Sequence, residues 1–90
     1  MPDKSVEREY IEAFGKSLKN LRISVAKKSL RMFSYEADIP CATLSRLENG
    51  TRIANIITLK RIAAEMNCSV SDLLKEIERT IPENIKNFDM

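Results

Sequence analysis

Several common residue types are scarce in this sequence. Its 90 residues include no histidine, two cysteines, two glycines and three prolines. Histidine is the most frequent general base and a common zinc ligand, so its absence disfavours most metabolic enzymes and zinc sites. β-Sandwiches and β-barrels need a turn-forming residue about every ten positions, which this chain lacks. The sequence therefore indicates a mainly helical protein that is not an enzyme and needs no metal or cofactor.

Long apolar runs and paired cysteines are missing as well. No stretch approaches the roughly 18 apolar residues of a membrane span. The acidic start MPDKSVEREY lacks the basic segment followed by an apolar segment that a secretory signal has. Cys41 and Cys68 form no CxxC pair, which favours free thiols in a reducing compartment. We expect a cytoplasmic protein without a membrane partner, and no small-molecule substrate is evident.

The net charge of +2 is unevenly distributed along the chain. Residues 15–61 carry ten basic and three acidic side chains, a net charge of +7, whereas residues 1–14 carry −2 and residues 62–90 carry −3. A basic middle between acidic ends favours a polyanionic partner. The alternative is that these charges only solvate helix surfaces, and the charge pattern leaves both interpretations open.

Apolar residues at helical spacing predict five helices in one small domain. The first spans about residues 6–26, and its apolar face consists of Ile11, Phe14, Leu18, Leu21 and Val25. Ser29 is the expected N-cap of a short second helix. Pro40 cannot continue that helix, so we expect a turn at residues 38–40.

The third helix is predicted at residues 41–48, and the Asn-Gly pair at 49–50 ends it. Asn55 is the expected N-cap of a fourth helix, whose inward face is predicted to hold Ile56, Leu59, Ile62, Ala63 and Met66. Asn67 suits the left-handed conformation after that helix. Ser69 then caps a fifth helix with an inward face of Val70, Leu73, Leu74 and Ile77.

The C-terminal segment predicts a short last helix, because TIPE at residues 80–83 has the spacing of a capping box. Apolar residues also recur there at steps of four, four and three: Ile77, Ile81, Ile85 and Phe88. This stripe has two interpretations of equal weight. It forms a dimer seam, or it packs back against the first helix.

Residues 29–50 have the plan of a helix-turn-helix, two short helices joined by a tight turn. The segment SLRMFSYEADIPCATLSRLENG and the following TRIANIITLKRIAAEMNCSVSDLL resemble the phage repressor and Cro type of helix-turn-helix regulators, the XRE family. The resemblance implies an all-α, five-helix, lambda-repressor-like DNA-binding domain at residues 14–76. An N-terminal extension of the first helix (1–13) precedes it. A short helical extension (77–90), a candidate for dimerisation, follows it.

The resemblance also implies roles for single residues. Residues 41–48 correspond to the recognition helix, whose base-contacting positions are Cys41, Ala42, Thr43 and Arg46. The positions that meet the sugar-phosphate backbone correspond to Ser29, Arg31, Asn49 and Arg52. Arg22 and Glu48 match a structural ion pair between the first and third helices.

The sequence departs from the family pattern at three places. Leu30 stands where a phosphate-binding glutamine is common, so we expect it to pack instead. Asp38 replaces the usual turn glycine, and Asp tolerates the left-handed conformation better than most residues. Cys41 and Ala42 replace the amide side chains that bind adenine. Direct readout should therefore be sparse, with Arg46 as the main reader.

Several of these residues also have a plainer interpretation. Arg46 either places its fork on guanine or contacts a phosphate or an acid such as Glu48. Cys41 could sense oxidants, but a lone thiol is weak evidence, and Cys68 suits a small core position. Four lysines either bind phosphate or solvate a helix face: Lys16, Lys19, Lys27 and Lys28.

The leading hypothesis is a small transcriptional regulator that binds double-stranded DNA as a homodimer on an inverted repeat. The alternative is an antitoxin-like or assembly module that binds a protein partner through the C-terminal apolar stripe. An enzyme is a distant third, because Cys41 has no histidine to activate it.

Overall fold

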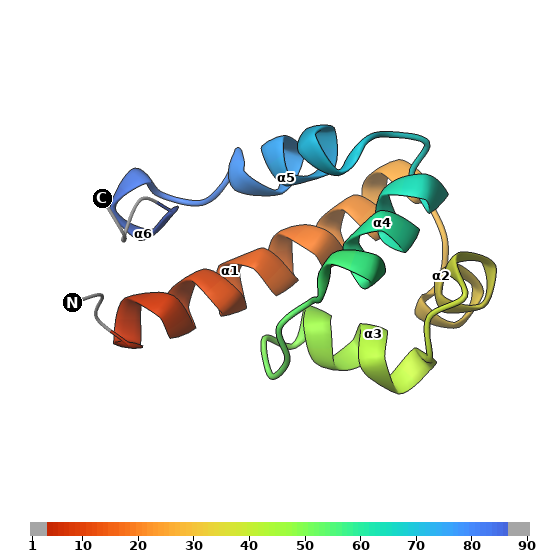
Figure 1. Cartoon of the computed structure of the whole chain (residues 1–90), viewed down its shortest axis with the longest axis horizontal. Helices are drawn as coiled ribbons and strands as arrows, with labels where there is room; N and C mark the ends of the chain where they lie inside the picture. The colour runs from red at the N-terminus through yellow and green to blue at the C-terminus, as the bar shows by residue number, and fades with distance from the viewer. Residues whose placement is uncertain (1–3, 87–90) are drawn as a thin grey trace.

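The longest helix, α1 (Lys4–Leu21), runs through the middle of the molecule, with shorter helices on both sides of it (Figure 1). The computed structural model describes residues 4–86. After α1 come a π-helical turn, η1 (Arg22–Ala26), and the helices α2 (Leu30–Ala37), α3 (Cys41–Glu48), α4 (Ile56–Glu65), α5 (Val70–Glu78) and α6 (Glu83–Lys86). Residues 4–86 contain no strand. The all-α fold class is confirmed, with five helices followed by a short sixth.

The starts of three helices follow from their capping residues, as predicted. The side chain of Ser29 accepts a hydrogen bond from the backbone N–H of Met32. The side chains of Asn55 and Ser69 accept the equivalent bonds at the starts of α4 and α5. Each cap satisfies one of the backbone donors that the first helical turn leaves free.

The ends of the helices depend on residues with positive φ. Asp38, Gly50 and Asn67 have φ of 58°, 73° and 57°, as the sequence predicts. Lys27, with φ of 55°, was not predicted. It follows from the wider turn of η1, in which the backbone N–H of Lys27 donates to the carbonyl of Arg22, five residues back.

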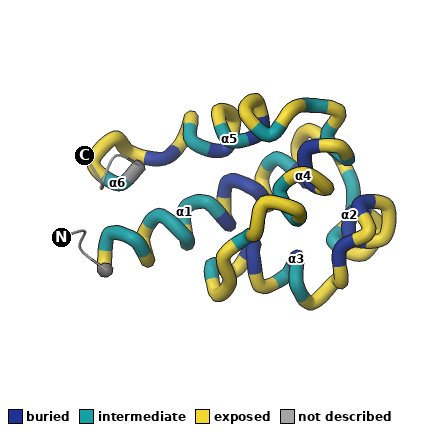
Figure 2. Tube along the Cα trace, in the orientation of Figure 1, coloured by how far each residue is buried: buried dark blue, intermediate teal, exposed yellow. Residues whose placement is uncertain are grey.

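The core lies between α1 and the shorter helices, as the buried segments in Figure 2 show. Its fully buried large side chains are Leu18, Phe33, Leu44, Leu47, Ile62, Leu73 and Ile77. Two predicted core positions are wrong. Val25 is exposed because the wider turn of η1 shifts the helical register before it, and Ile56 is exposed at the first position of α4.

The C-terminal apolar stripe packs against α1, the second of its two interpretations. Ile77 and Ile81 are buried, and Ile85 packs against the core. The hydroxyl of Ser17 in α1 donates to the carbonyl of Ile77 at 2.8 Å, and the hydroxyl of Tyr10 donates to Glu78. Phe88 lies outside the described residues.

The two glycines allow α1 and α3 to approach each other closely. A Cβ atom on Gly15 would lie 2.3 Å from the carbonyl oxygen of Leu47 and 2.6 Å from that of Glu48. Gly50 follows α3, and a Cβ there would lie 2.9 Å from the Cα of Glu12. The backbone of α3 therefore lies directly on α1, at a distance that larger residues would prevent.

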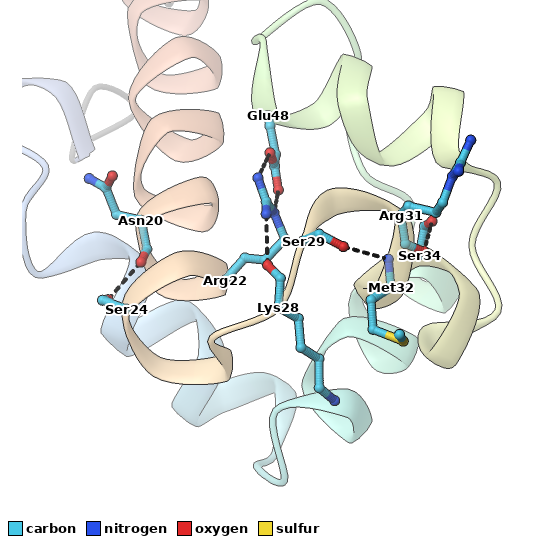
Figure 3. A network of polar contacts seen from close by, with 9 residues as sticks. All are labelled: Asn20, Arg22, Ser24, Lys28, Ser29, Arg31, Met32, Ser34 and Glu48. Carbon is cyan, nitrogen blue, oxygen red and sulfur yellow. Dashed lines mark hydrogen bonds and ion pairs between the residues drawn. The ribbon is translucent and has the colours of Figure 1, made fainter.

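A buried ion pair joins α3 to η1, directly after the end of α1 (Figure 3). Arg22 Nε donates to Glu48 Oε2 at 2.7 Å, and Arg22 Nη2 donates to Glu48 Oε1 at 3.0 Å. Arg22 Nη1 donates to the carbonyl of Lys28 at 2.9 Å. The hydrogen bond to Glu48 raises the pKa of Arg22 despite the opposing effect of burial. Because the pairing is bidentate, it sets the rotation of α3 as well as its distance from α1.

We predict that Gly15→Ala destabilises the protein by about 1–3 kcal/mol, because the added methyl group forces the backbones of α1 and α3 apart. Urea denaturation measures the change. Helix propensity alone predicts a gain of about 1 kcal/mol, so the sign decides between the two effects. An unchanged or increased stability would contradict the close approach.

We predict that Glu48→Ala costs about 3–5 kcal/mol, because it leaves the Arg22 guanidinium buried without its partner. The double variant Arg22→Met with Glu48→Leu should recover a large part of this loss. The exposed pair Arg79 and Glu76, 3.0 Å apart, provides the matched control, and Glu76→Ala should cost less than about 1 kcal/mol. Equal losses for Glu48→Ala and Glu76→Ala in urea denaturation would show that burial does not strengthen the pair.

Candidate nucleic-acid interface

The turn between α2 and α3 is held by backbone hydrogen bonds. The N–H of Ile39 donates to the carbonyl of Ser34 at 2.9 Å, and the N–H of Asp38 donates to that of Tyr35 at 3.3 Å. These two bonds, with Asp38 in the left-handed conformation, form a Schellman motif. Ile39 is buried and anchors the turn. The geometry is that of a helix-turn-helix, with Asp38 in place of the usual glycine.

Arg61 of α4 also supports this turn, and sequence reasoning missed it. Its Nη1 donates to the carbonyl of Asp38 at 3.0 Å. The contact joins residues 23 positions apart, so no local pattern indicates it. It links α4 to the residue that ends α2, within the turn of the helix-turn-helix.

The helix α3 has one buried face and one free face. Leu44, Leu47 and Glu48 are buried, whereas Ala42, Arg46 and Asn49 are exposed at steps of four and three. Cys41 is exposed at the first position. In Figure 1, α3 lies at the edge of the molecule, and α6 lies at the far end beside α1. The free face is therefore open to a large partner.

Arg46 stands on this free face. Among residues 4–86 no acid forms an ion pair with it, and Glu48 is bound to Arg22 instead. The interpretation in which Arg46 pairs with Glu48 is therefore wrong. Its guanidinium retains all of its side-chain donors for a partner outside the described chain.

Two other residues of α3, Thr43 and Ser45, are less exposed than Arg46. Thr43 is half-buried and lines a small cleft with Pro40, Leu47 and Thr58, on the side of α3 that faces α4. Ser45 is half-buried beside the free face and was not among the predicted residues. Its position three residues after Ala42 and four before Asn49 is the signal that could have identified it.

The residues predicted to meet the DNA backbone lie before and after α3 in the chain. Ser29 and Arg31 lie at the start of α2, where Ser29 is the N-cap. Asn49 and Arg52, both exposed, follow the end of α3. In Figure 3 the side chain of Arg31 extends away from the buried Arg22–Glu48 pair. An exposed cation, Arg52, therefore lies in the segment after α3, and another, Arg31, lies in the first turn of α2.

One of the four lysines considered as phosphate contacts is occupied elsewhere. Lys28 Nζ forms an ion pair with Glu65 and lies 3.4 Å from Glu36 Oε1. The hydrogen bond to Glu65 is the largest cause of the raised pKa of Lys28. Lys16, Lys19 and Lys27 are exposed. Lys28 therefore contributes to the packing of α4 rather than to a free basic surface.

The structure also bears on three other features of the sequence: a metal site, the Cys68 thiol and a membrane span. Within the described part of the chain, no three acidic, cysteine or histidine side chains gather as a metal ion would need. Cys68 packs against the core, and burial raises the pKa of its thiol. None of the helices between residues 4 and 86 combines the length and apolar content that crossing a bilayer requires.

Comparison with known proteins gives the same assignment as the geometry. A family model described as helix-turn-helix matches residues 8–73. The control protein C.MunI of a Mycoplasma species is 32% identical over 66 residues, which span 73% of this chain and 89% of that protein.

The fold is also similar to solved structures of the clp gene regulator ClgR from Corynebacterium glutamicum. One aligns with a TM-score of 0.65 at 26% identity, over 76% of this chain and 71% of that chain. A second aligns with a TM-score of 0.69 at 24% identity, over 82% and 95% of the two chains, and bears on the fold alone. Together, the helix-turn-helix geometry, the family match and these relatives show that the chain belongs to the XRE-type helix-turn-helix family of DNA-binding regulators and is not an enzyme.

Proposed function

We propose that the protein binds double-stranded DNA in a sequence-specific way by placing α3 in the major groove. The observation that carries this proposal is the exposed Arg46, unpaired within residues 4–86, on the free face of a helix whose opposite face is fixed to α1. An arginine fork can bind O6 and N7 of guanine together. Arg46 is the main reader in this proposal.

The other base contacts come from the first turn of α3. Ala42 offers a methyl group that can contact the methyl group of thymine. Cys41 lies next to Ala42 in the chain. Thr43 is half-buried, so only part of its side chain is free to contact the major groove. None of these three provides a bidentate contact to a base. Direct readout is therefore limited to a few base pairs.

Contacts with the sugar-phosphate backbone orient α3 in the groove. Ser29 and Arg31 approach one strand from the start of α2, and Asn49 and Arg52 approach the backbone at the end of α3. Neutralising phosphates releases counterions, so affinity falls steeply as salt rises. This part of the binding carries no sequence information.

The relatives support a role in transcription, because one is a control protein and the other a gene regulator. We propose that this chain acts in the same way, in the cytoplasm, as a homodimer on an inverted repeat. The two recognition helices would lie about 34 Å apart, one turn of DNA. The alternative of a protein-interaction module loses its proposed surface, because Ile77 and Ile81 are buried against α1.

We predict that Arg46→Ala and Arg52→Ala weaken DNA binding in different ways. Arg46→Ala should cost about 1–3 kcal/mol on the operator, relax specificity at one base pair and leave the salt dependence nearly unchanged. Arg52→Ala should weaken operator and random duplex alike and lower the salt slope by about 1. Selection of bound duplexes from a random pool provides the operator, and salt titrations measure both effects.

Lys75→Ala is the matched control, because it removes an exposed basic side chain from α5, outside the proposed interface. It should leave both affinities unchanged. The same loss for Arg46→Ala and Arg52→Ala on both duplexes would refute the division between base and phosphate contacts. Failure of the unaltered protein to bind any duplex at low salt would refute the proposed function.

A further inference from the structure

An apolar groove of about 440 Å³ lies beside the segment that follows α3. Its walls come from α1, from the segment between α3 and α4, and from the helices α4 and α5. Phe14, Leu59 and Leu74 line the groove, and the fold leaves all three of them only half-buried. Sites for small molecules have this order of volume and a mainly apolar lining. The groove is therefore suited to the apolar part of a small ligand.

One wall of the groove is aromatic. Tyr10 and Phe14 lie one helical turn apart on α1, and the centroids of their rings are 6.2 Å apart. The hydroxyl of Tyr10 donates to Glu78, so the polar end of this side chain already has a partner on α5. What Tyr10 and Phe14 offer to the groove is ring surface, which packs well against another ring or a large aliphatic group.

Two residues of opposite charge complete the lining of the groove. Glu7 comes from α1, and Arg52 comes from the segment after α3. No ion pair joins them to each other or to any other residue that the structure describes. One carboxylate and one guanidinium therefore keep their polar atoms available beside an apolar interior.

We propose that this groove binds an apolar α-amino acid, with the ligand carboxylate on Arg52 and the ligand ammonium group on Glu7. A guanidinium can donate two parallel hydrogen bonds to a carboxylate. A ligand with only a negative charge would be repelled by Glu7, and one with only a positive charge would be repelled by Arg52. A zwitterion satisfies both residues, and its side chain then enters the apolar interior beside Tyr10 and Phe14.

Occupation of the groove opposes DNA binding, because Arg52 is also the proposed phosphate contact. A guanidinium that binds the carboxylate of the ligand no longer neutralises a phosphate. Coupling between two ligands is reciprocal, so DNA weakens the binding of the amino acid by the same factor. This coupling rests on the proposed function, whereas the groove and its ligand do not.

An NMR titration of the full chain with L-phenylalanine, without DNA, tests the ligand site. The amide resonances of the residues that line the groove should shift. Arg52→Ala and Glu7→Gln should each weaken binding about 10-fold or more, because each removes a hydrogen-bonded charge. Arg52→Ala should not weaken the binding of phenethylamine, which has no carboxylate. Glu7→Gln should not weaken the binding of 3-phenylpropionate, which has no ammonium group.

Arg8→Ala is the matched control. Arg8 is an exposed arginine of α1 that lines the neighbouring shallow hollow with Glu7 and Arg52, but it does not line the groove. This variant should bind L-phenylalanine as tightly as the unaltered protein, and circular dichroism checks that every variant is folded. The absence of any shift at the groove would overturn the proposal, as would equal binding of L-phenylalanine by the unaltered protein, Arg52→Ala and Glu7→Gln.

Fluorescence anisotropy with a random duplex tests the coupling. Saturating L-phenylalanine should lower the affinity of the unaltered protein for the duplex about as much as Arg52→Ala does, and the same concentration should have no effect on Arg52→Ala. An unchanged duplex affinity would refute the coupling. A protein that binds L-phenylalanine in the groove but binds no duplex would refute the proposed function and support the ligand site.

Discussion

The position of α3 depends on the contact between Arg22 and Glu48. Two charges are buried together, and the bidentate geometry tolerates little rotation of either helix. Gly15 lets the backbones meet at the same place, so α3 is fixed in both distance and direction. A helix of eight residues is too short to be stable on its own in water, so the orientation of α3 depends on such tertiary contacts.

The rest of the site follows from this fixed helix. Leu44 and Leu47 are held inward, so Arg46 faces outward, and none of the acids that the structure describes pairs with it. Arg61 fixes the turn before α3 from the side of α4. The segment after α3 is placed on α1 by Gly50, and it carries Arg52 and Ile53 in succession. The proposed base contact at Arg46 and the proposed phosphate contact at Arg52 therefore both depend on how α3 and the segment after it pack on α1.

Local features of this fold could be predicted from the sequence because their causes are local. The caps Ser29, Asn55 and Ser69 act over three residues, and a residue such as Asp38 or Asn67 ends a helix through its own backbone conformation. Periodicity failed where the helix was irregular or ended. The π turn moved Val25 out of the core, and Ile56 lies at the first position of α4.

The sequence by itself determined the helices, their ends and the helix-turn-helix plan, since these depend on side chains and backbone within a few positions of one another. Only the tertiary structure decided which charges are free. In the sequence, Lys28 and Arg46 both read as free basic residues. In the structure, Lys28 binds Glu65, which lies 37 residues away. Glu48, two residues after Arg46, binds Arg22 instead of Arg46. The tertiary structure also decided that Ile77 is covered and Ile57 is not, because burial depends on which distant helix packs over a side chain.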